Sequence, residues 1–245
     1  MEKMSTPESD EDSRPLYAQV RDRLIERIKS GQWKPGQLIP NEFEIAAEFG
    51  VSQGTARKAI GELASERLLL RRQGRGTFVV EHTPDHVLFR FFNVFDPDGR
   101  AVIPDSRNTA WTLERATSEE RSHLGLARGA RVVRITRTRT RAGKAFIVET
   151  IALPEARFPG LVDRTELPNT LYDLFQKAYG TLVMRTDDRI SAVAADAKAA
   201  EVLGVATGAA LLKIDRLSFT LHDAPIEWRV SLCHLDQAYY LARTK

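Results

Sequence analysis

The sequence has little of the chemistry that defines several large classes of protein. It has one cysteine, Cys233, in 245 residues, which excludes an internal disulfide framework and favours a reducing, cytoplasmic environment. No apolar run is long enough to cross a bilayer, so we expect no membrane partner. The acidic start, MEKMSTPESDEDS, is unlike a secretory signal. Five scattered histidines form no Cys/His pairs at ligand spacing, so we expect neither a metal nor a cofactor.

Positive charge is concentrated in one part of the chain, although the net charge is only +3. Residues 1–13 hold one lysine against five acids and are expected to form a disordered tail. Residues 14–80 hold 12 lysines and arginines against 7 acids, whereas residues 81–245 hold 23 against 21. The segment 14–80 is therefore suited to a polyanionic partner.

The patterning of residues 14–80 predicts three short helices and a hairpin. A first helix is expected over residues 16–30, where apolar residues recur every fourth position, and a second over residues 42–49. Ser52 can cap a third helix that runs to about Glu66. Two short apolar runs around a Gly-Arg-Gly turn in LLLRRQGRGTFVV then predict a hairpin. This order describes a winged helix-turn-helix.

A linker is expected at residues 81–86, followed by a second domain over residues 87–245. Strand-like runs outnumber helical patterns there, and most neighbours are joined by hairpin-length turns such as RAGK and HDAP, which favours an antiparallel α+β domain. The expected strands are VLFRFFNVF, ARVVRITRTRTR, AFIVETIAL, TLVMRTDDRISAV, ALLKIDRLSF and IEWRVSL. The expected helices are SEERSHLGL, NTLYDLFQKAY and DAKAAEVLGV.

Two glycines lie on the polar face of the third predicted helix, VSQGTARKAIGEL, where each costs about 1 kcal/mol relative to alanine. On a helical wheel, Gly54 and Gly61 lie with Arg57 and Lys58 opposite the apolar residues. Small residues let the helix backbone approach a partner, and two cations suggest that the partner is anionic. Residues in the first turn of such a helix, here including Gln53, contact base edges in a major groove. The alternative is that this face is simply exposed to solvent and that its glycines have no functional role.

The turn of the predicted hairpin is crowded with arginines. Arginine is favoured in a narrow minor groove because the negative potential is enhanced there, although the same cations could serve only solubility. Together, the helix, the hairpin and the charge gradient favour binding to double-stranded DNA. We expect ten residues to take part: Gln53, Gly54, Thr55, Arg57, Lys58, Arg72, Gln73, Gly74, Arg75 and Thr77.

The stretch IPNEFEIAAEFGVSQGTARKAIGELASERLLLRRQGRGTFV resembles the GntR family of bacterial transcription regulators, over essentially all of residues 15–80. The proline before the second helix, the GVS turn, the T-x-R-x-A-I run and the RRQGRGTFV wing agree in order and spacing. Phe43 and Gln53 stand where the family often has arginine, so the operator is expected to depart from the usual family sequence. The resemblance implies DNA contacts by four residues: Thr55, Arg57, Gly74 and Arg75.

The strand-like run ARVVRITRTRTR changes character along one face. Because alternate side chains of a strand share a face, Val133 and Ile135 lie in line with three arginines, Arg137, Arg139 and Arg141. A core face that becomes cationic suggests a cavity entered from one end. A three-residue loop after this strand would pair Glu149 near Ile135 on the arginine face, and a two-residue loop would place it on the opposite side. An ordinary ion pair on a solvated sheet is the alternative.

Most of residues 87–245 resembles the effector-binding domain of the HutC-type subfamily, called UTRA, which shares its fold with chorismate lyase. The better markers are R-I-T-R-T-R, the downstream V-E, T-L-Y-D-L-F and P-I-E-W. The resemblance implies that two arginines clamp an anion. It also implies that a threonine and a tyrosine donate hydrogen bonds to the effector near a helix N-terminus, and that two glutamates accept hydrogen bonds from hydroxyl or N–H groups of the effector. These effector residues are Arg137, Arg139, Glu149, Thr170, Tyr172 and Glu227.

These observations predict a ligand-responsive transcription regulator, a repressor rather than an activator, that binds a pseudo-palindromic operator as a homodimer. The expected effector is a small anionic metabolite, either a phosphorylated sugar or a carboxylate. Cys233 stands where sugar-phosphate relatives commonly have tyrosine, which weakens the case for a sugar. One alternative is a constitutive, architectural DNA-binding dimer. Another is a lyase-type enzyme, although no nucleophile–base pair or metal cluster favours it.

Overall fold

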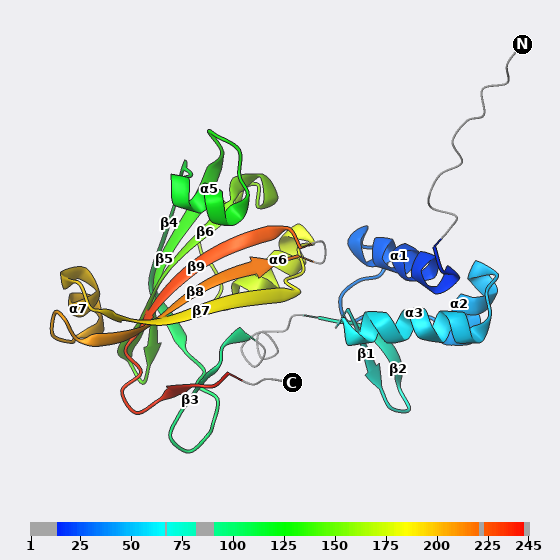
Figure 1. Ribbon diagram of the computed structural model, residues 1–245, viewed down its shortest axis with the longest axis horizontal. Helices are drawn as coiled ribbons and strands as arrows, with labels where there is room; N and C mark the ends of the chain where they lie inside the picture. Colours follow the sequence, from blue (N-terminus) through cyan, green and yellow to red (C-terminus); the bar gives the residue numbers. More distant parts are fainter. Residues whose placement is uncertain (1–13, 67, 82–90, 221–222, 243–245) are drawn as a thin grey trace, which may run out of the picture. The chain divides into compact units, whose positions relative to one another are not determined.

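The chain forms two compact units, one ending at Glu81 and the other beginning at His82 (Figure 1). The expected tail at 1–13 and residues 82–86 of the expected linker lie outside the described residues. The computed structural model describes four stretches of the chain: residues 14–66, 68–81, 91–220 and 223–242.

The first unit confirms the predicted winged helix-turn-helix. Its helices and strands follow the order expected from the sequence, with a two-stranded antiparallel wing in which Arg72 pairs with Gly76. Its elements are α1 (Leu16–Lys29), α2 (Glu42–Phe49), α3 (Gln53–Ser65), β1 (Leu69–Arg72) and β2 (Gly76–Val79).

Local caps fix where the helices of this unit begin. The side chain of Asn41 accepts hydrogen bonds from the first turn of α2 in a capping box, and Ser52 Oγ accepts one from the Thr55 N–H at the start of α3. The first predicted helix forms as α1, but its buried stripe differs from the four-residue spacing of its apolar residues. Leu16 is exposed and Ile25 is buried, because a helix repeats every 3.6 residues and the buried stripe drifts.

The second unit is an antiparallel α+β domain, as predicted. Six of its strands form one sheet in the order β4-β5-β6-β9-β8-β7, and β3 pairs with β10 separately. The described strands are β3 (Val94–Phe95), β4 (Asp105–Arg115), β5 (Arg131–Arg141), β6 (Lys144–Pro154), β7 (Arg185–Ala194), β8 (Ala210–Phe219), β9 (Pro225–Cys233) and β10 (Tyr239–Tyr240). The helices are α5 (Ser118–Leu124), α6 (Leu171–Tyr179) and α7 (Ala197–Leu203), with 3-10 turns η2 (Glu155–Arg157) and η3 (Leu161–Asp163).

Three strand predictions need correction. Strand β4 was not expected, because its sequence DSRNTAWTLER is polar and a register shift between Arg107 and Ala110 interrupts its alternation. Of the run VLFRFFNVF, only Val94–Phe95 is strand among the described residues, and positions 87–90 lie outside them. Strand β7 begins at Arg185, four residues later than expected.

The two faces of the six-stranded sheet are covered differently. Helices α5 and α7 pack through apolar residues such as Leu124 and Leu203 on one face (Figure 1). The other face carries two separate apolar clusters, one centred on Phe175 of α6 and the other including Ile147 and Cys233. Along β6, Glu149 lies between Ile151 of the first cluster and Ile147 of the second. The polar residues of this face are thereby enclosed between apolar neighbours.

Candidate functional site

The β5–β6 hairpin decides which side chains reach the enclosed face. Its turn has two residues, Ala142 and Gly143, both with positive φ, so the shorter of the two loops that the sequence left open is the one that forms. A register shift at Arg139 leaves Phe146 as an extra residue in β6, and this β-bulge restores the parity that the shorter turn would have reversed. Glu149 therefore lies on the arginine face.

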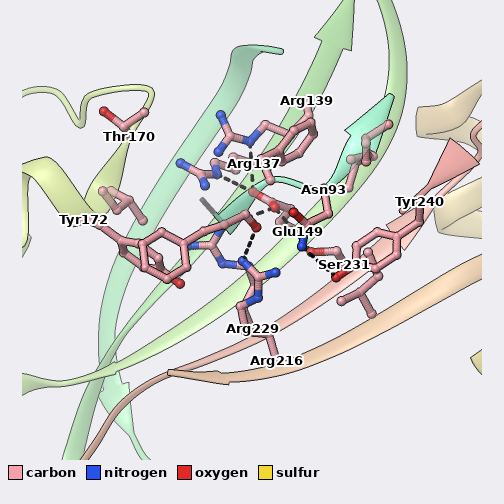
Figure 2. A pocket seen from close by; sticks show the side chains of 16 residues that line it. Asn93, Arg137, Arg139, Glu149, Thr170, Tyr172, Arg216, Arg229, Ser231 and Tyr240 are labelled. Atoms are coloured by element: carbon pink, nitrogen blue, oxygen red, sulfur yellow. Dashed lines mark hydrogen bonds and ion pairs between the residues drawn. The ribbon is translucent and has the colours of Figure 1, made fainter. Parts of the chain in front are cut away.

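The carboxylate of Glu149 is the centre of a buried ionic cluster (Figure 2). Its Oε2 atom accepts hydrogen bonds from Arg137 Nε at 2.5 Å and Arg139 Nε at 3.1 Å. Its Oε1 atom accepts from Arg229 Nη1 at 3.4 Å and Ser231 Oγ at 3.3 Å. Both oxygens of this carboxylate are thus occupied by protein donors.

A second carboxylate, Glu227, lies behind this cluster. It is fully buried and accepts hydrogen bonds from Tyr172 OH at 2.8 Å and from Arg229 Nη2 at 2.8 Å. The residues that line the cavity do not include it, so the expectation that it accepts directly from an effector does not fit this geometry. Its contacts instead orient the tyrosine and the arginine.

The cavity has about 600 Å³ of empty space, a volume that includes space open to solvent. Five expected residues line it: Arg137, Arg139, Glu149, Thr170 and Tyr172. Five more polar residues line the cavity and were not expected from the sequence; they are labelled in Figure 2: Asn93, Arg216, Arg229, Ser231 and Tyr240.

A signal for three of the missed residues exists in the sequence. In β8, Leu212 and Ile214 share a face with Arg216, which repeats the apolar-to-polar change in β5. In β9, Arg229 and Ser231 alternate on the same face as Glu227, a residue that the sequence had already singled out. Asn93 and Tyr240 reach the cavity through the separate β3–β10 pairing, for which no local pattern exists.

One guanidinium in the cavity wall is incompletely satisfied. Arg137 is 3% exposed, and its Nη1 atom lies 3.3 Å from the carbonyl of Asn169. Its Nη2 atom is buried and has no hydrogen-bond partner among the described residues. A buried donor without a partner is costly, so a ligand that supplies an acceptor here would be stabilised.

The pKa shifts locate the excess positive charge. Burial lowers the pKa of Arg137, and burial with repulsion from Arg137 lowers that of Arg139 to about 9. Burial acts likewise on Arg216 and Arg229, but their carboxylate partners more than offset it, so the pKa of each is raised. Burial would raise the pKa of Glu149, yet the surrounding arginines hold it well below its usual range. The uncompensated charge is therefore at Arg137 and Arg139.

The first unit presents the glycine-bearing face of α3 to open space. Its opposite face is buried through Ala56, Ala59 and Ile60. Apart from the neighbouring backbone of the helix itself, a Cβ atom built on Gly61 would meet no described atom within 4 Å, and one on Gly54 would meet Ser52 Oγ at 3.8 Å. Packing within the described part of the chain therefore does not require either glycine.

The expected DNA-contacting side chains differ in their surroundings. Arg57 on α3 and Arg75 in the wing turn are exposed and make no ion pair with the described residues. Lys58 Nζ lies 3.6 Å from the centre of the Tyr17 ring, and Arg72 stacks on Phe78. The remaining six residues occupy the start of α3 and the wing: Gln53, Gly54, Thr55, Gln73, Gly74 and, half-buried in β2, Thr77.

Neither a metal-binding cluster nor a membrane-spanning helix is found among the described residues. No group of three or more His, Cys, Asp or Glu side chains there could hold a metal ion. No helix in that part of the chain is long and apolar enough to span a bilayer.

A winged helix-turn-helix joined to a domain with a cationic cavity defines a ligand-binding transcription regulator. Residues 16–79 match the family described as bacterial regulatory proteins, gntR family, and residues 100–238 match the UTRA domain. The chain therefore belongs to the GntR family and carries a UTRA domain, as the sequence predicted. This family comprises transcription regulators, so the lyase-type alternative is wrong.

Two relatives of known name match this chain over different lengths. The HTH-type transcriptional repressor NagR of Bacillus subtilis is 28% identical over 224 residues, covering 91% of this chain and 92% of that protein. The histidine utilization repressor of Pseudomonas aeruginosa is 42% identical over 82 residues, or 34% of this chain and 33% of that protein.

Solved structures also match this chain. The ligand-binding domain of a GntR-family regulator from Bordetella bronchiseptica is 31% identical, with a TM-score of 0.58, and the match covers 64% of this chain and 98% of that domain. PhnF from Mycobacterium smegmatis is 28% identical, with a TM-score of 0.55, over 92% of this chain and 99% of that one.

Proposed function

We propose that this regulator is a repressor whose affinity for its operator changes when a small anion binds in the UTRA cavity. The observation that carries the proposal is the buried Arg137 Nη2 atom in the cavity wall, which lacks a partner among the described residues. A guanidinium fork matches the oxygens of a carboxylate or phosphate. The names of NagR and the histidine utilization repressor support repression rather than activation.

DNA contact is assigned to the glycine-bearing face of α3 and to the wing. The backbone at Gly54 and Gly61 can approach a duplex closely because no large side chain stands in the way. Arg57 and Arg75 are exposed beside these surfaces and can pair with phosphates or guanine. A homodimer would place two such helices in successive major grooves of a pseudo-palindromic site.

A route from the cavity toward the DNA-binding unit begins at Phe91. This residue and Asn93 line the cavity, and they are the first described residues after the junction between the units. Arg216, which also lines the cavity, donates a 2.6 Å hydrogen bond from Nη1 to the Phe91 carbonyl and a bidentate pair to Asp188. A ligand that competes for this guanidinium would disturb the backbone that leads to the junction. A ligand can change operator affinity only if it binds more tightly to one arrangement of the protein than to another.

Selection of random duplex DNA with the full chain, followed by band-shift titration, tests this function. We expect a pseudo-palindromic site to be enriched, and an anion found by thermal-shift screening of phosphorylated sugars and small carboxylates to change its affinity. Failure to enrich any site would overturn the proposal. An affinity for the site that no stabilising anion alters would instead favour the constitutive, architectural dimer.

Unchanged anion affinity in both the Arg137→Ala and the Arg139→Ala protein, measured by calorimetry, would remove these two residues from the proposed clamp. Size-exclusion chromatography with light scattering tests the dimer separately, and a monomer at the concentrations that bind the operator would exclude it.

A further inference from the structure

The charged acceptors around the cavity are already occupied. Both oxygens of Glu149 accept from arginine or serine. Both oxygens of Asp188 accept from Arg216 at 2.7 Å, and Oδ2 also accepts from Tyr240 OH at 2.7 Å. A sugar offers several hydroxyl donors, and each would need an acceptor once water is excluded. The carboxylates of this cavity do not supply them.

The charge left uncompensated is a single positive one. Four arginines, at positions 137, 139, 216 and 229, face three carboxylates, Glu149, Glu227 and Asp188. A carboxylate ligand carries one negative charge and would neutralise this excess. A phosphate monoester carries about −1.5 to −2 at neutral pH and would leave the buried cluster negative.

The rest of the wall is largely hydrocarbon. Side chains from the N-terminal segment, β6, α6 and β8 meet there, and two phenylalanines are among them. Such a wall gains free energy from contact with an apolar ligand and none from contact with hydroxyl groups. The apolar lining residues are Phe91, Phe92, Val94, Ile147, Leu171 and Ile214.

From these three observations we infer that the effector is a monocarboxylate with a hydrocarbon or aromatic body, and that phosphorylated sugars are excluded. The carboxylate oxygens accept from Arg137 Nη2, beside Thr170 and the N-terminus of α6, and the body lies against the apolar wall. This inference rests on the proposed function, since it names the class of anion that the same cavity binds.

Four six-carbon probes distinguish the contribution of the charged head group to binding from that of the body: hexanoate, hexyl phosphate, gluconate and glucitol 6-phosphate. With 3-phenylpropionate as a second apolar body, each is titrated into the full-length protein by calorimetry and thermal shift. We expect hexanoate or 3-phenylpropionate to bind at least about tenfold more tightly than the other three, a difference well within what one charge mismatch or several unpaired hydroxyls produce.

Substitutions in the cavity wall test where the bound probe lies. Arg137→Gln should abolish carboxylate binding, whereas Arg131→Gln, which changes an exposed arginine of the same strand, should not. If Arg137→Gln fails to fold, Thr170→Val should weaken carboxylate binding several-fold. Tighter binding of glucitol 6-phosphate, hexyl phosphate or gluconate would overturn the inference and leave the proposed anion-responsive function standing. No saturable binding by any of the five probes would count against both.

Discussion

Arg137 and Glu149 lie directly opposite each other on β5 and β6, and both residues are 3% exposed. Neither could be buried alone, because an isolated charge in the interior costs several kcal/mol. The pair brings in Arg139 and Arg229, which share the same carboxylate. One glutamate therefore holds three arginines at the wall of the cavity.

Replacing this carboxylate should destabilise the UTRA unit strongly. Glu149→Gln leaves the three guanidinium groups with less compensation, and we expect the free energy of unfolding to fall by about 3–5 kcal/mol. Urea denaturation followed by circular dichroism measures it. The matched control is Glu155→Gln, which breaks an exposed pair with Arg131 and should cost less than about 1 kcal/mol. Equal losses in the two variants would contradict a structural role for Glu149.

The same carboxylate should make stability depend on pH. The arginines hold the pKa of Glu149 well below the ordinary value of 4.5, so the ionised form is favoured in the folded state. Its contribution to the free energy of unfolding is complete above about pH 4.5 and is lost as the pH falls toward the folded-state pKa. Denaturation between pH 3 and 7 should therefore show a steeper acid loss for the wild type than for Glu149→Gln. Parallel curves would show that another group is responsible.

The glycine at position 61 should affect stability and DNA binding in opposite directions. Because no described atom lies within 4 Å of a Cβ built there, Gly61→Ala should stabilise α3 by up to about 1 kcal/mol. The same methyl group would stand between the helix and a duplex, so operator affinity should fall, and Gly61→Leu should lower it further. Thermal unfolding and fluorescence anisotropy measure the two effects. Unchanged DNA affinity in the leucine variant would show that this face does not approach DNA.

Loss of a single exposed arginine should weaken DNA binding in a salt-dependent way. Arg57→Ala and Arg75→Ala each remove an exposed cation from the proposed DNA surface. If the lost contact is to a phosphate, the slope of log affinity against log salt should fall by about 1, and if it is to guanine, sequence discrimination should fall instead. Arg131→Ala, which removes the same charge from the UTRA unit, serves as the control. Equal effects of all three changes would indicate only a general charge effect.

Arg216 should couple the cavity to the junction between the units. Arg216→Lys keeps the charge but cannot hold both Asp188 and the Phe91 carbonyl as the guanidinium does. We expect anion affinity to change little, while the effect of the anion on operator affinity, typically about 5- to 150-fold in such systems, shrinks toward none.

Band-shift titrations with and without the anion measure this coupling. Arg189→Lys, an exposed arginine of β7, is the matched control and should retain full coupling. A normal anion response in Arg216→Lys would show that the signal follows another route.

Much of the architecture could be predicted because its determinants are local. The caps at Asn41 and Ser52, the left-handed Gly50 and the apolar stripe of α3 each act within a few residues. The alternation in β5, β6, β8 and β9 likewise follows from the sequence. Strand β4 was missed because its polar residues and internal irregularity hide the alternation that marks a strand.

The cavity could be predicted only in part, because cross-strand register is not local. Turn length alone would have placed Glu149 away from the arginines, and the bulge at Phe146 reverses that outcome. Whether Glu227 reaches a ligand depends on Tyr172, which comes from a helix distant in the sequence and donates a hydrogen bond to the Glu227 carboxylate.

The sequence by itself determined the class of protein, the two folds, and the cations and glycines of the DNA-binding unit, since these depend on short-range patterns of side-chain size and polarity. Only the tertiary structure decided which charges meet in the cavity and which one is left over, with Arg137 Nη2 unpaired among the described residues. The reason is physical: compensation of a buried charge depends on distances between strands, and a single extra residue in one strand changes every pairing beyond it.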